Sequence, residues 1–108
     1  MALSKNEAIN LVKKFLHLCV QKHHIKQAYL FGSYATGRAK DYSDVDLAIV
    51  LETLSTSEGA PYSEGFRIFH EAQQYNSILE VVCFPEESFH QNSNPLVARI
   101  KQEGIPVM

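Results

Sequence analysis

Two short polar motifs near the middle of the chain have residue types and a spacing that could do chemistry together. Gly32-Ser33 is followed, after ten residues, by Asp44-x-Asp46. Residues two apart on a strand point to the same side, so a strand through this segment would present both carboxylates on one face. Two like charges side by side need a cation, and carboxylate oxygens suit Mg²⁺, which shares its coordination with phosphates. The second motif therefore predicts a magnesium site.

The Gly32-Ser33 turn is typical of a phosphate-binding segment. Glycine permits a close backbone approach, and the exposed N–H groups at the start of a helix attract phosphate. The Ser33 hydroxyl adds a donor there and is expected to cap the short helix that follows. Arg38 and Lys40 are near enough in sequence to reach a polyphosphate, with a solvated surface role as the alternative for each.

Glu80 is the candidate for a third metal-binding carboxylate. It lies in the apolar run 78–84, where a carboxylate is costly unless it is paired or bound to metal. If the strand through Glu80 adjoins the strand after Asp44, three carboxylates could hold two metal ions about 3.5–4 Å apart. The alternative is an edge-strand carboxylate that faces solvent.

Residues 31–50 resemble the minimal nucleotidyltransferases of the DNA polymerase β-like superfamily, of the MntA-like antitoxin type. The resemblance implies that Gly32 and Ser33 bind a nucleoside triphosphate, and Arg38 and Ser43 are the further nucleotide-binding candidates. It also implies that the catalytic and metal-binding residues are Asp44, Asp46 and Glu80. The family more commonly has Asp at the third position, so Glu80 is one methylene longer than expected. Ser43 is in addition expected to turn the backbone into the following strand.

The same resemblance implies a Mg²⁺-dependent enzyme, with two ions, that transfers a nucleoside monophosphate, AMP from ATP, to a hydroxyl. Similar single domains are often the antitoxin of a toxin–antitoxin pair with a helical HEPN-type partner. Two alternatives stay open: a non-catalytic module that neutralises a toxin on the same fold, and a transferase with a small-molecule acceptor. Because larger relatives hold the acceptor with an additional domain, we expect a partner protein or a homo-oligomer to supply that function.

Hydrophobic spacing and turn residues predict the elements that position these side chains. Ser4 and Glu7 form a capping box before an apolar helical stripe, and Asn94-Pro95 forms the start of a last helix that Gly104 ends. The expected elements are a helix at 4–23, a strand at 28–31, a short helix after Ser33, a strand at 45–51, a surface loop at 52–63 that could act as a mobile flap, a helix at 63–76, a strand at 78–84 and a helix at 94–104. This order predicts an α/β (α+β) domain, a small mixed β-sheet flanked by helices.

Length and composition set limits on the class of protein. The 108 residues fit one domain, 1–108, with 45% hydrophobic and 20% charged residues, and no run approaches the ~20 apolar residues that span a bilayer. A formal charge of −2 argues against long nucleic acid as a partner. The first residues lack the apolar core of a secretion signal, so we expect a cytoplasmic protein. Cys19 and Cys83 are expected to be small apolar residues, and the five histidines solvated or helix-capping ones.

Overall fold

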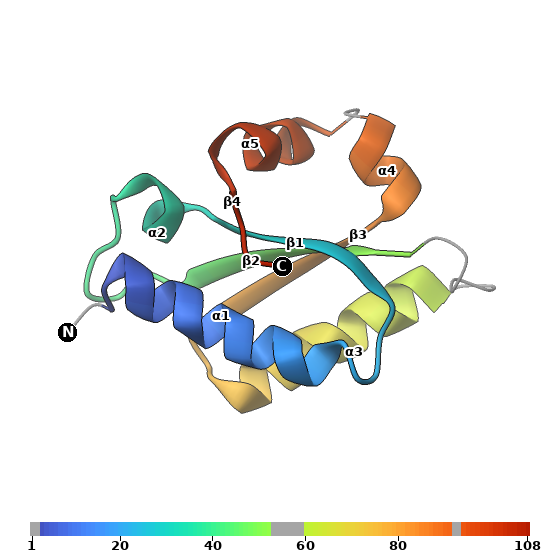
Figure 1. Cartoon of the computed structure of the whole chain (residues 1–108), viewed down its shortest axis with the longest axis horizontal. Helices are drawn as coiled ribbons and strands as arrows, with labels where there is room; N and C mark the ends of the chain where they lie inside the picture. The colour runs from blue at the N-terminus through green and yellow to red at the C-terminus, as the bar shows by residue number, and fades with distance from the viewer. Residues whose placement is uncertain (1–2, 53–59, 92–93) are drawn as a thin grey trace.

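The computed structural model describes residues 3–52, 60–91 and 94–108 as a four-stranded mixed sheet with helices on both sides (Figure 1). The strand order is β3-β2-β1-β4; β2 and β3 are parallel, and β1 is antiparallel to both β2 and β4. The predicted fold class is therefore confirmed. Along the chain the elements are α1 (Lys5–Cys19), β1 (Ile25–Phe31), α2 (Ser33–Thr36), β2 (Val45–Leu51), α3 (Ala60–Tyr75), β3 (Leu79–Pro85), α4 (Glu86–Gln91), α5 (Pro95–Glu103) and β4 (Ile105–Pro106).

Each face of the sheet packs against its own pair of helices. On β2, Leu47 and Ile49 belong to the core that includes buried residues of α1 and α3, whereas Ala48 and Val50 belong to the core with Phe89 of α4 and residues of α5. Figure 1 shows α1 and α3 on one side of the sheet and α4 and α5 on the other. Because side chains alternate along a strand, Asp46 points to the α4 and α5 side, at the start of β2.

The first helix begins as predicted and ends earlier. The Ser4 hydroxyl accepts from the Glu7 N–H, and the Glu7 carboxylate accepts from the Ser4 N–H, which completes the capping box. The helix ends at Cys19 instead of residue 23, since the His23 N–H donates to the Cys19 carbonyl in a tight turn. That turn brings His23 under α3, as described below.

Several other boundaries differ from the predicted ones for local reasons. The strand at 45–51 and the last helix, with Asn94 as its cap, are confirmed. β1 is longer than predicted, starting at Ile25, because its polar residues pair with β2. α3 starts at Ala60, so the predicted loop is too long, and the proposed flap falls on 53–59, outside the described residues. β3 is shifted by one residue to Leu79–Pro85.

Two elements, α4 and β4, were not predicted. α4 is too short to show a helical period, and its buried Phe89 packs against Tyr29, with ring centroids 5.5 Å apart. β4 is two residues long and is defined by its pairing with Tyr29 and Leu30 of β1. Within the described ranges, none of the helices has the length and apolar character required to span a membrane.

Candidate active site

The turn between β1 and α2 holds a glycine that no other residue can replace without distortion. Gly32 has φ 78° and ψ −153°, a backbone conformation that L-residues rarely adopt. A Cβ on Gly32 would also overlap the Asp46 carboxylate. The Gly32 carbonyl accepts from the Ala35 and Thr36 N–H groups, so the same residue begins the short helix. The turn and the carboxylate are thus in direct contact.

The pairing of β2 with β3 places the second and third carboxylates in register. Asp46 lies opposite Glu80 in the parallel ladder, and the Val45 N–H donates to the Ile78 carbonyl at 2.8 Å just before it. Asp44 immediately precedes β2 and is exposed. Since residues in register on adjoining strands point to the same side, Asp46 and Glu80 share one face of the sheet. The condition set in the sequence analysis, that the strand through Glu80 adjoins the strand after Asp44, is therefore met.

Two of the three carboxyl groups, Asp46 and Glu80, have raised pKa values. The pKa of Asp46 is raised to about 6, first by burial and then by the charges of Glu80 and Asp44. The pKa of Glu80 is raised above its usual range by a side-chain hydrogen bond with Asp44, by burial and by the Asp44 charge. Every cause that acts on these two pKa values raises them, so negative charge on Asp46 and Glu80 is unfavourable without a cation.

These residues fit a divalent cation in their chemistry, although they are not arranged as a complete metal site. Over residues 3–52, 60–91 and 94–108, no three His, Cys, Asp or Glu side chains form a group with ligand geometry. Oxygen donors from Asp44, Asp46 and Glu80 are nevertheless the type that Mg²⁺ prefers, and mutual repulsion is what a cation relieves. A bound ion would draw the three together. Glu80 is exposed on an edge strand, which is the environment that the alternative interpretation of this residue supposed.

The other nucleotide-binding candidates lie around the same turn. Ser33 is the first residue of α2 and is not its cap, because Gly32 occupies that position and α2 has no side-chain cap. Arg38 follows Gly37 at the end of α2 and is exposed; its N–H donates to the Ser33 carbonyl. The Ser43 hydroxyl accepts from the Lys40 N–H at 2.7 Å, which confirms its role in the turn. The nucleotide-binding roles of Gly32, Ser33, Arg38 and Ser43 stay predictions.

One supporting residue was missed by the sequence analysis. Tyr34 on α2 is buried, and its hydroxyl accepts from the Leu3 N–H at 3.2 Å. This bond ties the start of α1 to the turn that carries Gly32. The signal in the sequence was an aromatic residue in a segment otherwise made of small and polar residues.

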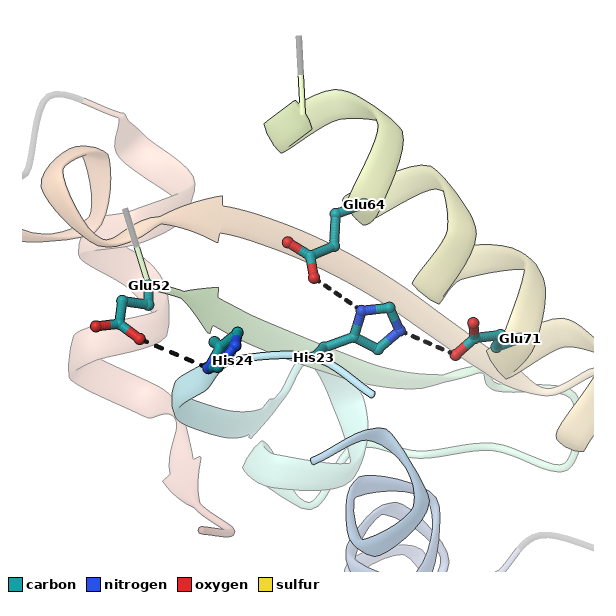
Figure 2. Close-up of polar contacts among 5 residues, drawn as sticks. All are labelled: His23, His24, Glu52, Glu64 and Glu71. Atoms are coloured by element: carbon teal, nitrogen blue, oxygen red, sulfur yellow. Dashed lines mark hydrogen bonds and ion pairs between the residues drawn. The ribbon is translucent and has the colours of Figure 1, made fainter. Parts of the chain in front are cut away.

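A second cluster of charged side chains lies at the opposite end of β1 (Figure 2). His23 is buried, with its Nδ1 2.8 Å from Glu64 Oε2 and its Nε2 3.2 Å from Glu71 Oε1. Ionised carboxylates only accept hydrogen bonds, so each ring nitrogen of His23 faces an acceptor. The prediction of a solvated or capping histidine is wrong for His23, because α3 brings two glutamates against it. His24 next to it is exposed and lies 3.9 Å from Glu52.

The chain is similar to known nucleotidyltransferases over nearly its whole length. A family described as Polymerase beta, Nucleotidyltransferase matches residues 13–108. The chain belongs to this family of nucleotidyltransferases, and the resemblance seen in residues 31–50 is confirmed.

A shorter segment is similar to a curated protein. Over 47 residues, 42% of this chain, it is 45% identical to the Methanocaldococcus jannaschii protein named "Putative protein adenylyltransferase". The aligned segment spans 32% of that relative. The similarity therefore covers less than half of either protein.

Solved structures share the fold at low sequence identity. One described as a "putative nucleotidyltransferase from Sulfolobus solfataricus" has a TM-score of 0.56 at 15% identity, covering 98% of this chain and 87% of that one. A toxin–antitoxin structure with AMP-PNP has a TM-score of 0.58 at 22% identity, covering 93% and 72%. The toxin–antitoxin MntA-HpeT has a TM-score of 0.50 at 18% identity, covering 98% and 73%. At these identities the likeness establishes the fold.

Proposed function

We propose that this domain transfers AMP from ATP to a hydroxyl group in a Mg²⁺-dependent reaction, with pyrophosphate leaving. The observation that carries the proposal is the in-register pair of Asp46 and Glu80, with Asp46 in contact with the Gly32 turn. A phosphate-binding turn and a cation-binding carboxylate group must be adjacent to act on a triphosphate. Here they are so close that a Cβ on Gly32 would overlap the Asp46 carboxylate. The domain 1–108 is proposed to carry this chemistry as one unit.

In the proposed mechanism the residues of the chain bind, orient and accept a proton. The backbone N–H groups after Gly32, with Ser33 and Arg38, hold the triphosphate, and Asp44 and Asp46 hold Mg²⁺ against it. When bound, Mg²⁺ ions, of which we propose two, neutralise the charge that develops on the phosphoryl oxygens. The acceptor oxygen bonds to the α-phosphorus as the bond to the β-phosphate oxygen breaks. The Glu80 carboxylate accepts the proton of the attacking hydroxyl.

The proposed biological role is that of an antitoxin that modifies a HEPN-type helical toxin. Support comes from the fold shared with two toxin–antitoxin structures, one of them with AMP-PNP, and from the similarity to a protein named as an adenylyltransferase. A homo-oligomer is the alternative source of an acceptor-binding surface. The cytoplasm is the proposed compartment, which agrees with two free cysteines, Cys19 and Cys83. Burial raises the pKa of each thiol to about 12, so both stay protonated and unreactive.

Two other functions are separated from this one by a single labelling experiment. The protein is incubated with α-labelled ATP and Mg²⁺, with and without the product of the neighbouring gene, and the labelled component is identified. Label on the neighbouring protein supports the antitoxin role, label on a small molecule supports a different acceptor, and binding without transfer supports a non-catalytic module. Asp44→Asn should lose transfer by at least about a thousandfold, whereas Glu103→Gln, an exposed control on α5, should not.

A further inference from the structure

A groove runs along the outer side of α1, between α1 and the C-terminal end of α3. Three depressions of about 240, 460 and 390 Å³ adjoin there, and Tyr75 lines all of them. The depressions of 240 and 460 Å³ share Leu18, and the depressions of 460 and 390 Å³ share Lys14. Because the lining residues contributed by the N-terminal part of the chain run from Leu3 to Lys22, the groove is about as long as α1, or roughly 22 Å for its 15 residues.

The floor of the groove is apolar and partly exposed. Leu18 is 46% exposed and Tyr75 is 40% exposed. The Tyr75 ring packs against the buried ring of Phe15, with ring centroids 5.6 Å apart. An exposed aromatic ring on a rigid support is the kind of residue that anchors protein interfaces.

Lysines outnumber carboxylates along the groove, where Glu7 and Glu71 each line one of the two end depressions. Lys13, Lys14 and His17 line the central depression, and Lys22 lines one end. Within the part of the chain that the structure describes, no ion pair involves any of the three lysines. Residues 3–24 hold four lysines and one glutamate, a formal charge of +3, in a chain whose formal charge is −2. Net positive charge is thus concentrated in residues 3–24, which include α1 and the turn after it.

We propose that this α1–α3 groove is a docking site for an acidic amphipathic helix of a partner protein. The apolar face of that helix would cover Leu18 and Tyr75, and its carboxylates would face Lys13, Lys14 and Lys22. A groove about 22 Å long accommodates about 15 helical residues. The site lies across the sheet from Asp46 and Glu80, so a partner bound here leaves the carboxylates accessible. The proposal goes beyond the transferase activity and does not depend on it.

Fluorescence anisotropy with a designed probe tests the groove. The probe is a labelled helical peptide of about 15 residues with leucines at i, i+3, i+4 and i+7 and glutamates on the flanking positions. We expect saturable binding that weakens as salt increases, and at least about a fivefold loss of affinity in Lys14→Glu. Arg99→Glu on α5 makes the same charge change away from the groove and should bind as wild type. Leu18→Ser should also weaken binding, and Val20→Ser, a similarly exposed residue outside the groove, should not.

Circular dichroism of each variant is the control that tests whether it remains folded. The proposal is overturned if the probe shows no saturation up to about 1 mM, or if Arg99→Glu and Val20→Ser weaken binding as much as their groove counterparts. It is also overturned if a single-stranded RNA of similar length competes more strongly than the peptide. Self-association that Lys14→Glu abolishes, measured by sedimentation, would identify a second copy of the chain as the occupant instead.

Discussion

The two clusters of charged side chains in this domain are built in opposite ways. At one end of β1, His23 is buried between Glu64 and Glu71, and each ring nitrogen has a carboxylate partner. At the other end lie the carboxyl groups of Asp44, Asp46 and Glu80. The pKa of Asp46 is raised by burial and by the charges of the other two, and that of Glu80 chiefly by a hydrogen bond with Asp44. A buried charged pair is costly to break, whereas like charges held together repel each other, and a proton or a bound cation relieves that repulsion. We therefore propose a structural role for the first cluster and a catalytic role for the second.

The largest effect that would sharpen the comparison is expected at Gly32. In Gly32→Ala the added Cβ overlaps the Asp46 carboxylate and the backbone is strained, so transfer should fall by about a thousandfold. Gly37→Ala is a matched control, because Gly37 has nearly the same φ, 77°, and a Cβ there would meet nothing within 4 Å. The control should lose about 1 kcal/mol of stability and little activity. Equal losses of transfer in single-turnover assays would show that backbone strain, and not contact with Asp46, explains the effect.

The next effect concerns Glu80, the exposed member of the carboxylate group. Glu80→Gln keeps the size and removes the charge, so transfer should fall by about a hundredfold, while Mg²⁺-dependent ATP affinity should largely persist on Asp44 and Asp46. Glu80→Asp keeps the charge with a shorter reach and should retain partial activity. Calorimetry and single-turnover kinetics measure the two properties separately. Transfer by Glu80→Gln at the wild-type rate would make Glu80 an ordinary edge-strand carboxylate.

Breaking the paired cluster should change stability instead of activity. His23→Ala leaves Glu64 and Glu71 without their partner and should lower the free energy of unfolding by about 3 kcal/mol. His24→Ala is the adjacent control; its side chain is 74% exposed, and its loss should change stability by less than about 0.5 kcal/mol. Urea denaturation measures both. If folded His23→Ala, assayed at low temperature, has lost transfer while keeping its stability, the assignment of this cluster to structure is wrong.

The sequence predicted the carboxylate cluster better than the paired one for a physical reason. Asp44 and Asp46 are two residues apart, and the apolar run around Glu80 marked a strand, so local pattern identified all three carboxylates as candidates. That the two strands are neighbours was only a condition, which the structure meets. His23 meets Glu64 and Glu71 only after α3 has packed over the sheet, 41 and 48 residues later in the chain. The exposure of Glu80 depends likewise on β3 being an edge strand, which tertiary structure decides. α4 and β4 were missed because their short lengths carry no period.

The smallest expected effect is a gain of stability from removing one of the repelling charges. The folded pKa of Asp46 is about 6, against about 3.9 in an unfolded chain. Between these values the folded protein binds more protons, so the contribution of Asp46 favours folding at acid pH and is lost as the pH rises through 6. At pH 7.5 without divalent metal, Asp46→Asn should therefore be more stable than wild type, by about 1 kcal/mol once solvent screening of this half-buried group is allowed for.

Near pH 4.5 the difference should shrink, because wild-type Asp46 is then largely protonated. Added Mg²⁺ should stabilise wild type at pH 7.5 and not the variant, since only the ionised carboxylate binds the ion. Urea denaturation at both pH values, with Glu103→Gln as the control, measures the difference, and an Asp46→Asn protein less stable than wild type at pH 7.5 would mean that the carboxylates at this end of the sheet are not stored repulsion.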